Sequence, residues 1–449
     1  MNALDSLGRF AATLRFGDLP EPVRDHTGWI LADTLAAIVA GSAEPELRAL
    51  AARQPAQPGA TLPGLGRTTA PAGAALVNGT AGTFLEMDEG NRFSRGHPAV
   101  HVLPAALALA ETLPTDADTF LSALVAGYEV GSRLGAASQL RGAMHPHGTW
   151  GTIGAAAASA RARGFDEARV REAINVGASL TLATSKKTML EGGLVRNVYA
   201  GLSNHNGLLA AELAGCGFTG ERDGLQSLFG TIVSERFDTG VVLRDLGTDW
   251  HLMHNYFKRH SCCRYNHGTL DALDAIDARE GLPDADRVAR VRVRTYGLAA
   301  ELRDPAPRNT LAAKFSVPFA VATRLVNRHS GLAAFTWDAV RDPAVQALAA
   351  RVEVLEDEAM SGRLPQERPA KVCITTVEGR VLEAAVGVNR GDDASPYTPQ
   401  ELGDKFRELC GRVWPGAHAD ELLQATLGLV RDRVALPHWL ELLRRPPRA

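Results

Sequence analysis

Residues Gly148 to Arg163 read Gly-Thr-Trp-Gly-Thr-Ile-Gly-Ala-Ala-Ala-Ala-Ser-Ala-Arg-Ala-Arg, a helical stretch in which most side chains are small. Small residues let a neighbouring backbone approach closely, as helices do when they pack in a protein core. We therefore predict that this stretch is a core helix of a tight helical bundle.

Helical patterns extend outward from this stretch in both directions. Apolar residues recur at helical spacing between turn signals, and no convincing strand interrupts them. Residues 54–70 are rich in Pro and Gly and are predicted as a loop. The predicted helices cover residues 20–41 (an amphipathic helix), 44–53, 72–85, 102–113, 116–137, 167–182, 199–214 and, later in the chain, 398–443.

The pattern changes from helical to alternating after Pro283. Val291, Val293 and Thr295 alternate with arginines, which predicts a half-exposed strand. The fold class is therefore mainly α, with a large all-helical domain (residues 1–268 and 397–449) and an inserted smaller α/β domain (residues 269–396). Within the smaller domain we predict strands at 351–355, 371–377 and 380–388, the last two joined by a turn at 378–379, and a helix at 312–329.

Composition restricts the classes of function. The chain has 449 residues, of which 45% are hydrophobic, enough for a globular protein with a large core. A net charge of −3 without long runs of like charge argues against general binding to nucleic acid or anionic membranes. Without a signal-like N-terminus or an apolar run of about 20 residues, we expect a cytoplasmic protein. Its five cysteines are expected to be reduced thiols.

A polar segment, Phe84 to His101, lies between two apolar helical stretches. Its glycines and Pro98 predict a loop at the mouth of a core, where charged groups are tolerated only if they are paired or in use. A solvated loop with ordinary surface charges is the alternative. The candidate site residues here are Glu86, Asp88, Glu89, His97 and His101.

Three further loops ahead of helices carry imidazoles or cations. His145 and His147 precede the helix at 148, whose N-terminus favours an anion such as a substrate carboxylate. Arg196 lies in a Gly-containing loop before another apolar helix. Because the chain has only six lysines, lysines at suggestive places stand out. The remaining candidates are Lys258, Arg259, His260, Arg264, His267 and Lys314.

Metal, nucleotide and nucleophilic chemistry fit these residues less well. Pro98 and Pro104 keep His97 and His101 off a regular helix, and adjacent cysteines such as Cys262 and Cys263 rarely share a metal, so we predict no metal site. Catalysis with Cys262 or Cys263 as the nucleophile is an alternative that fits these residues less well. The one Gly-x-Gly-x-x-Gly match, residues 215–220, follows a predicted helix where a dinucleotide site needs a strand. The His, Asp/Glu, Arg and Lys set instead suits proton transfer next to a carboxylate.

Four stretches together resemble the MmgE/PrpD family, in order and spacing, over nearly the whole chain. They are residues 86–92 with Gly96-His-Pro and 103–111; residues 145–156, from His145-Pro-His to Gly-Ala-Ala; Val195-Arg-Asn-Val-Tyr-Ala-Gly; and Lys258 followed by His267, with Ala313-Lys-Phe-Ser-Val-Pro-Phe downstream. The family includes 2-methylcitrate dehydratase, cis-aconitate decarboxylase and iminodisuccinate epimerase. The resemblance implies a helical domain with an inserted α/β lid domain, usually a homodimer, and chemistry without metal or organic cofactor on small di- or tricarboxylic acids.

The resemblance also assigns roles to residues. The family's active-site acid falls on Asp88, with Glu86 or Glu89 as alternatives, and its histidines fall on His97, His145 and His267. Several members have a lysine in place of Arg196 and a tyrosine in place of Phe319. An arginine binds carboxylates but does not practically transfer protons, so these two departures leave the reaction type open.

We therefore predict a cofactor-independent lyase, a hydro-lyase or a decarboxylase, acting on a small polycarboxylate. Asp88, His97 and His145 are predicted as catalytic, with His97 or His145 moving the proton because imidazole is a base suited to neutral pH. The predicted substrate-binding residues are Arg196, Lys258, His267, Glu89, His147 and Lys314. The alternatives are an epimerase of a dicarboxylate, a catalytically silent carboxylate-binding homologue, and histidines that only hydrogen-bond helix ends. We place the cleft between the two domains, because Lys314 belongs to the smaller one.

Overall fold

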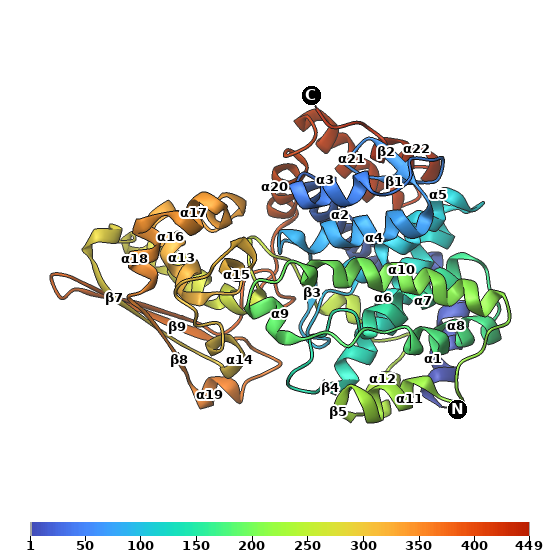
Figure 1. The fold of residues 1–449 in the computed structure, drawn as a ribbon, viewed down its shortest axis with the longest axis horizontal. Coiled ribbons are helices and arrows are strands. Elements are labelled where there is room, and N and C mark those ends of the chain that lie inside the picture. The colour runs from blue at the N-terminus through green and yellow to red at the C-terminus, as the bar shows by residue number, and fades with distance from the viewer. Residues whose placement is uncertain (1, 449) are drawn as a thin grey trace.

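The computed structural model describes residues 2–448, and its secondary structure is mainly helical (Figure 1). The α/β part lies at one end of the molecule and a larger helical body forms the rest. The body contains α1 (Ala3–Thr13), α2 (Glu21–Ser42), α3 (Pro45–Ala52), α4 (Pro71–Phe84), α5 (Leu103–Thr112), α6 (Ala117–Ala137), α7 (Trp150–Ala162), α8 (Glu167–Ser179), α9 (Lys186–Leu190), α10 (Val195–Gly215), α11 (Gly224–Ser227) and α12 (Thr239–Leu243).

The prediction of a core helix at residues 148–163 is confirmed by α7. This helix is buried from Trp150 to Ala160 and packs against α5, α6, α8 and α10. Its small residues are needed for this packing, because a Cβ atom at Gly151 would overlap the ring of His101. The close approach therefore brings α7 against the polar loop that precedes α5.

The C-terminal helices return to the helical body, as predicted. α20 (Pro399–Cys410), α21 (Gly416–Leu429) and α22 (Leu436–Leu443) follow the α/β part, and α20 and α21 pack against α2 (Figure 1). The prediction that α2 is amphipathic is wrong for its second half, which is buried all round from Ile30 to Ser42. The returning helices cover the face that would otherwise meet solvent.

The α/β part has a four-stranded sheet and a hydrophobic core of its own. The strand order is β10 (Val381–Val386), β9 (Ala370–Thr376), β7 (Val288–Thr295), β8 (Val352–Glu356); β7 and β8 are parallel and the other pairs antiparallel. All four predicted strands are confirmed. α13 (His267–Glu280) and α16 (Val317–Asn327) pack with the sheet and with each other, and α18 (Pro343–Ala349) packs against α16. The boundaries at 268/269 and 396/397, and a role of this part as a lid, stay predictions.

Other predictions of local structure need correction. Residues 54–70, predicted as a loop, contain the hairpin of β1 (Ala60–Leu62) and β2 (Arg67–Thr69). The helix predicted at 312–329 is two helices, α15 (Thr310–Lys314) and α16. The first ends with Phe315 as its C-cap, and the Ser316 hydroxyl caps the second by accepting from the Phe319 N–H. Two short strand pairs also interrupt the helices: β3 (Gly90–Asn91) with β6 (Asn255–Tyr256), and β4 (Ser138–Leu140) with β5 (Ser234–Phe237). Strands of two to four residues are too short to show a period of two.

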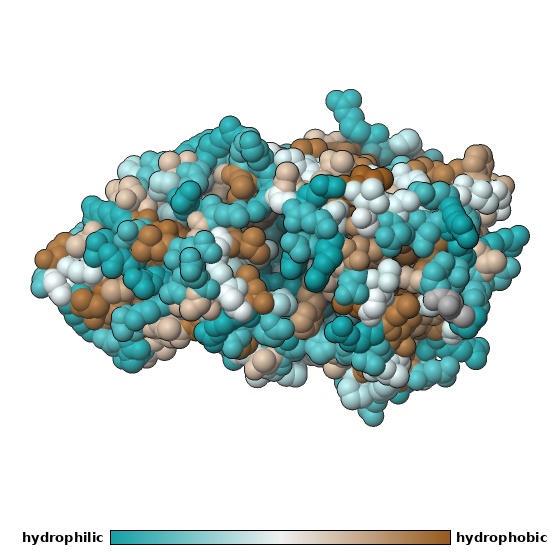
Figure 2. All heavy atoms as spheres, turned by 90° about the horizontal axis from the view of Figure 1, so that it is seen from below, coloured by the Kyte–Doolittle hydropathy of each residue, from teal (hydrophilic) through white to brown (hydrophobic). Residues whose placement is uncertain are grey.

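Within residues 2–448, none of the helices has both the length and the apolar character that crossing a membrane requires. The face shown in Figure 2 is mostly hydrophilic, and its hydrophobic residues form separate small patches.

Candidate active site

The loop between α4 and α5 is buried, so the alternative of a solvated surface loop is wrong. Glu86, Asp88 and Glu89 each expose 1% or less of their surface. The carboxyl group of Glu89 holds the loop together: it accepts hydrogen bonds from the Ala99 N–H (3.0 Å) and from the Tyr128 hydroxyl (3.0 Å). Pairing of β3 with β6 ties the same loop to residues 255 and 256. These contacts fix the positions of Asp88 and His97.

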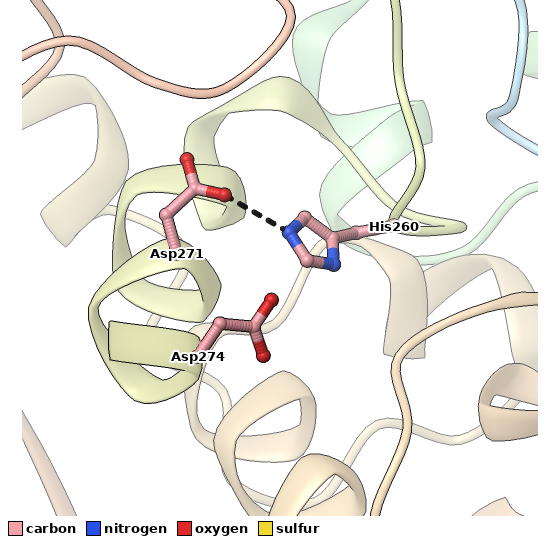
Figure 3. A group of neighbouring side chains, drawn as sticks. All are labelled: His260, Asp271 and Asp274. Carbon is pink, nitrogen blue, oxygen red and sulfur yellow. Dashed lines mark hydrogen bonds and ion pairs between the residues drawn. The ribbon is translucent and has the colours of Figure 1, made fainter. Parts of the chain in front are cut away.

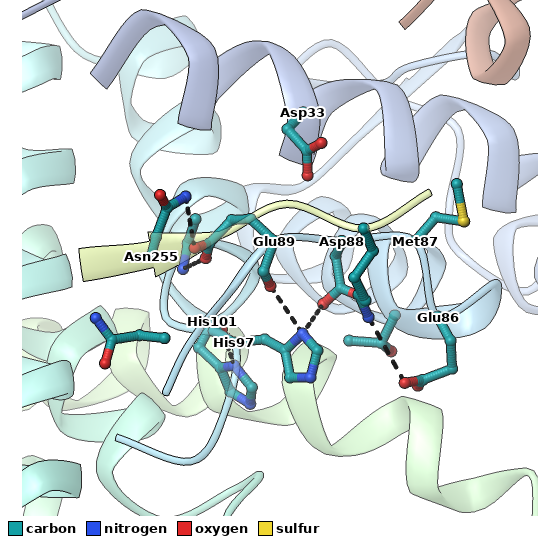
Figure 4. A network of polar contacts seen from close by, with 12 residues as sticks. Asp33, Glu86, Met87, Asp88, Glu89, His97, His101 and Asn255 are labelled. Carbon is teal, nitrogen blue, oxygen red and sulfur yellow. Dashed lines mark hydrogen bonds and ion pairs between the residues drawn. The ribbon is translucent and has the colours of Figure 1, made fainter. Parts of the chain in front are cut away.

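One ring nitrogen of His97 is held by the loop and the other is free. Nδ1 lies 2.8 Å from the carbonyl oxygen of Glu89 and 3.0 Å from Oδ2 of Asp88, and Figure 4 shows Nε2 turned away from both groups. Because a carbonyl oxygen only accepts, the proton of a neutral His97 resides on Nδ1. Nε2 then carries a lone pair, has no hydrogen-bond partner in the described part of the chain, and can act as a base.

Asp88 is an ionised carboxylate at the centre of this loop. Burial raises the pKa of Asp88, but His97 and Lys258 outweigh burial and hold the pKa well below its usual range. Lys258 Nζ lies 3.3 Å from Oδ1 of Asp88 and 3.7 Å from Oε2 of Glu86. A negative charge fixed beside His97 stabilises the imidazolium that forms when Nε2 takes up a proton.

His145 offers a hydrogen-bond donor where His97 offers an acceptor. The backbone N–H of His147 donates to Nδ1 of His145 over 3.0 Å, so the proton of the neutral ring resides on Nε2. Burial and then the charge of Arg196 hold the pKa of His145 well below its usual value. His145 is therefore a neutral N–H donor near neutral pH.

Two further imidazoles fill the space behind His97 and His145. The ring of His147 lies 5.1, 4.6 and 4.7 Å from the rings of His97, His101 and His145. Burial lowers the pKa of His101 to about 4 and holds the pKa of His147 well below its usual value. Both rings are therefore neutral and add no charge to the site.

Some of these side chains, but not Asp88 or His101, line a cavity of about 180 Å³ between the helical body and the α/β part. His97, His145 and His147 line it together with Tyr256, Trp150 and Phe315. Among its lining residues in the described chain, Glu86 is the only carboxylate. The cations that line it are Arg95, Arg141, Lys186, Arg196, Arg264 and Arg368. An excess of cations in a partly enclosed cavity favours a ligand with several negative charges.

Some of these cations already have a carboxylate partner. Arg196 Nη1 forms a buried ion pair with Oε1 of Glu86, and Lys186 pairs with Glu301. Arg264 lies 2.9 Å from Asp392. Arg196 thus lines the cavity as predicted, but its charge is shared with the protein's own carboxylate.

Four of the predicted substrate-binding residues do not line the cavity. Glu89 binds the loop, as described above, and Lys258 lies behind Asp88 and Glu86. His267 is held between the Arg264 guanidinium, which donates to its Nδ1 (3.1 Å), and the Cys262 carbonyl oxygen (3.3 Å). Lys314 Nζ donates to Ser261 Oγ (3.2 Å) and lies 5.1 Å from the centre of the Phe335 ring. Each of the four is bound by other groups of the protein, so their direct contact with substrate stays a prediction.

Phe319, which replaces the tyrosine of several family members, packs in the core of the α/β part against Phe335 and does not line the cavity. Cys263 does line the cavity, but burial raises the pKa of its thiol to about 11. The thiolate needed for a nucleophile is therefore scarce near neutral pH.

A second polar group, His260 with Asp271 and Asp274, lies outside this cavity (Figure 3). His260 Nε2 lies 3.2 Å from Asp271, and its Nδ1 lies 2.6 Å from the Ser330 hydroxyl. Arg324 pairs with Asp274 at 2.9 Å. The arginine partner opposes binding of a cation there, so we interpret the group as a structural link between α13 and the loop after α16.

Sequence reasoning missed several residues that line the cavity, chiefly Tyr256, Arg141, Lys186 and Arg368. Tyr256 stands two residues before Lys258, so proximity to that lysine is the available signal. The two arginines are among 42 in the chain and stand in no motif. Only the fold brings them to the site.

Two family models match the chain. The family model described as MmgE/PrpD N-terminal domain matches residues 5–234, and the one described as MmgE/PrpD C-terminal domain matches residues 260–429.

Among curated proteins, cis-aconitate decarboxylase of Aspergillus terreus is 26% identical over 97% of this chain and 95% of the relative. The cis-aconitate decarboxylase-like protein oryM of Aspergillus oryzae is 24% identical over 95% and 94%. Human cis-aconitate decarboxylase is 25% identical over 80% and 76%. Because the two family matches together cover most of its length, the chain belongs to the MmgE/PrpD family.

Proposed function

We propose that the protein is a cofactor-independent lyase that moves a proton at a carbon next to a carboxylate of a small di- or tricarboxylic acid. The observation that carries the proposal is the arrangement of His97. Its Nδ1 is held by Asp88 and Glu89, and its Nε2 is free on a cavity lined by six cations and one carboxylate. A base oriented in this way, next to charges that bind a polyanion, suits formation of an enolate-like intermediate.

Each residue of the site has a separate role in the proposed reaction. Nε2 of His97 takes a proton from carbon, or returns one to it, and Asp88 stabilises the resulting imidazolium. Nε2–H of His145 donates a hydrogen bond to the oxygen on which negative charge develops, and Arg196 adds positive charge to the same wall. Lys258 acts indirectly, because it keeps Asp88 ionised.

The names of the relatives favour decarboxylation as the reaction type. In decarboxylation of an unsaturated tricarboxylate, the bond to one carboxyl carbon breaks and CO₂ leaves. The electron pair of that bond is captured by one proton, which His97 first takes up from solvent on Nε2 and then delivers to carbon. In dehydration, a proton leaves carbon and hydroxide leaves with a second proton as water. Both reactions need the same acid–base pair, so we propose decarboxylation first and dehydration second, with epimerisation of a dicarboxylate as a further outcome.

A panel of acids tests the proposal and separates these reactions. The purified protein is incubated with cis-aconitate, 2-methylcitrate, citrate and iminodisuccinate, and products are followed by proton NMR together with CO₂ release. CO₂ from cis-aconitate supports decarboxylation, and water loss without CO₂ supports dehydration. If the acids raise the melting temperature but none reacts or exchanges protons with solvent, the protein is a silent carboxylate-binding homologue.

We expect turnover to be unaffected by removal of metal ions. The proposed steps use only imidazole, carboxylate and guanidinium groups, so dialysis against EDTA followed by passage over a chelating resin leaves kcat within about twofold of the untreated protein. Elemental analysis of the treated sample provides the control. Activity that disappears on chelation and returns with zinc, iron or magnesium contradicts the proposed mechanism.

The homodimer implied by the family resemblance stays a prediction, which light scattering during size-exclusion chromatography tests.

A further inference from the structure

Arg368 differs from the other cations of the cavity in its surroundings. It stands in the segment between α19 (Glu358–Ser361) and β9, on the α/β side, and exposes 5% of its surface. Within residues 2–448 no carboxylate lies within ion-pair distance of its guanidinium, and Nη1 is buried without a hydrogen-bond partner. Arg95 and Arg141 also lack a carboxylate partner in this part of the chain, but both are exposed and therefore hydrated.

A buried guanidinium without an anion is costly, and its position here is fixed by the protein. Nη2 donates to the Arg92 carbonyl oxygen over 3.3 Å, and the guanidinium lies 5.3 Å from the Tyr256 ring centre and 5.9 Å from that of Tyr265. Stacking on aromatic rings orients the planar group while leaving its edge free for an anion. Unpaired buried charges in cavities are a feature of binding sites, because the ligand supplies the missing partner.

The place of Arg368 relative to His97 sets the length of the ligand. The Tyr256 ring neighbours both groups: it lies 6.4 Å from the His97 ring and 5.3 Å from the Arg368 guanidinium, centre to centre. Burial raises the pKa of Tyr256 to about 12, so its hydroxyl stays protonated and can donate a hydrogen bond. A small acid with its reacting carbon at His97 can therefore place a second carboxylate beside Arg368.

We propose that Arg368 is the specificity-determining residue that binds the substrate carboxylate remote from the reacting carbon, with Tyr256 supporting it. This inference rests on the proposed function. It implies that substrates carry at least two carboxylates, and that a bound substrate bridges the helical body and the α/β part. Arg196 is already paired with Glu86, and it contributes positive charge to the part of the cavity wall near His97 and His145.

The inference is tested with Arg368→Gln and Arg368→Lys on the full chain. For the diacid or triacid substrate identified above, we expect Arg368→Gln to lower kcat/KM by roughly 30-fold or more, because a buried charge partner is lost. Arg368→Lys should recover part of the loss. For the same substrate with its remote carboxylate converted to an amide, the wild-type protein should be slow and Arg368→Gln should change kcat/KM by less than about threefold. Equal losses on acid and amide overturn the inference.

A binding experiment keeps the test independent of turnover. Tricarballylate, a saturated tricarboxylate, is titrated calorimetrically into the wild-type protein, Arg368→Gln and the control Arg363→Gln, which alters an exposed arginine paired with Glu367. We expect weaker binding by roughly 30-fold or more only in Arg368→Gln, with butyrate binding equally weakly to all three. Selective weakening without any turnover would disprove the lyase proposal but keep the carboxylate site; unchanged affinity overturns the site itself.

Discussion

Replacing His97 by Gln lowers kcat by roughly 10²- to 10⁴-fold, the range expected for loss of a general acid–base group. Glutamine has nearly the same volume and stays polar, but it has no group that can take up a proton. His97 also exposes little surface and is buried in the loop of Asp88, so a conservative replacement is needed to keep the loop in place. The measurement is steady-state turnover on the acid identified from the panel, with folding checked by circular dichroism.

The matched control is His205→Gln, a half-buried histidine on α10 that does not line the cavity. It should retain near-normal turnover and melting temperature. His97→Gln with near-normal kcat would instead show that His97 only supports the loop and is not the base. A drop in turnover that matches only the drop in folded fraction would lead to the same conclusion.

The Glu89→Gln substitution is expected to remove a large pH dependence of the free energy of unfolding. Burial raises the pKa of Glu89 to about 8, so the native protein holds a proton there that the unfolded chain, with an ordinary glutamate, releases near its usual pKa of 4.5. The contribution of the protonated Glu89 carboxyl to the free energy of unfolding is therefore fully present at low pH and is lost as the pH rises through about 8. Linkage gives a change of about 1.4 kcal/mol per pH unit, or up to about 4 kcal/mol between about pH 5 and pH 8.

Urea-unfolding midpoints at about pH 5, 6.5 and 8 measure this dependence. The introduced glutamine side chain resembles the protonated carboxyl in shape and does not titrate, so the variant should gain stability relative to wild type as the pH rises. Glu46→Gln, on the exposed side of α3, should follow the wild-type curve at all three values. Parallel curves for wild type and Glu89→Gln would mean that the buried carboxyl is ionised in the native state, stabilised by Ala99 and Tyr128.

Sequence reasoning predicts the elements that are long enough to show a repeated pattern of residue types. α7 is recognisable from its run of small residues, and β7 from its alternation of valine with arginine. The hairpin of β1 and β2 is not, because three residues cannot show a period and the Pro and Gly around them indicate only a turn. Likewise Ser316 divides a helical pattern that looks continuous in the sequence.

The candidate site can be predicted where each loop carries its own signal. His97 and His145 are recognisable because each stands in a polar loop before an apolar helix. Arg196 is predicted in such a loop as well, but the structure places it in the first turn of α10; all three line one cavity. The direction in which a side chain points is not predictable. Glu89 and Asp88 are neighbours, yet Tyr128 and the Ala99 N–H turn Glu89 inward while His97 and Lys258 hold Asp88 at the site. Arg368 has no local signal at all, since only the packing of the α/β part places it there.

Exchange with solvent deuterium tests the central claim most directly, namely that His97 moves a proton at a carbon of a small polycarboxylate. The acid that reacts is incubated in D₂O with wild type and with His97→Gln, and deuterium at carbon is followed by NMR and mass spectrometry. We predict one solvent deuterium at carbon, in the product of decarboxylation or in the substrate recovered from reversible dehydration or epimerisation, and a rate at least about 10²-fold lower in His97→Gln. Incorporation at the wild-type rate in His97→Gln, or decarboxylation without any deuterium at carbon, would contradict the claim.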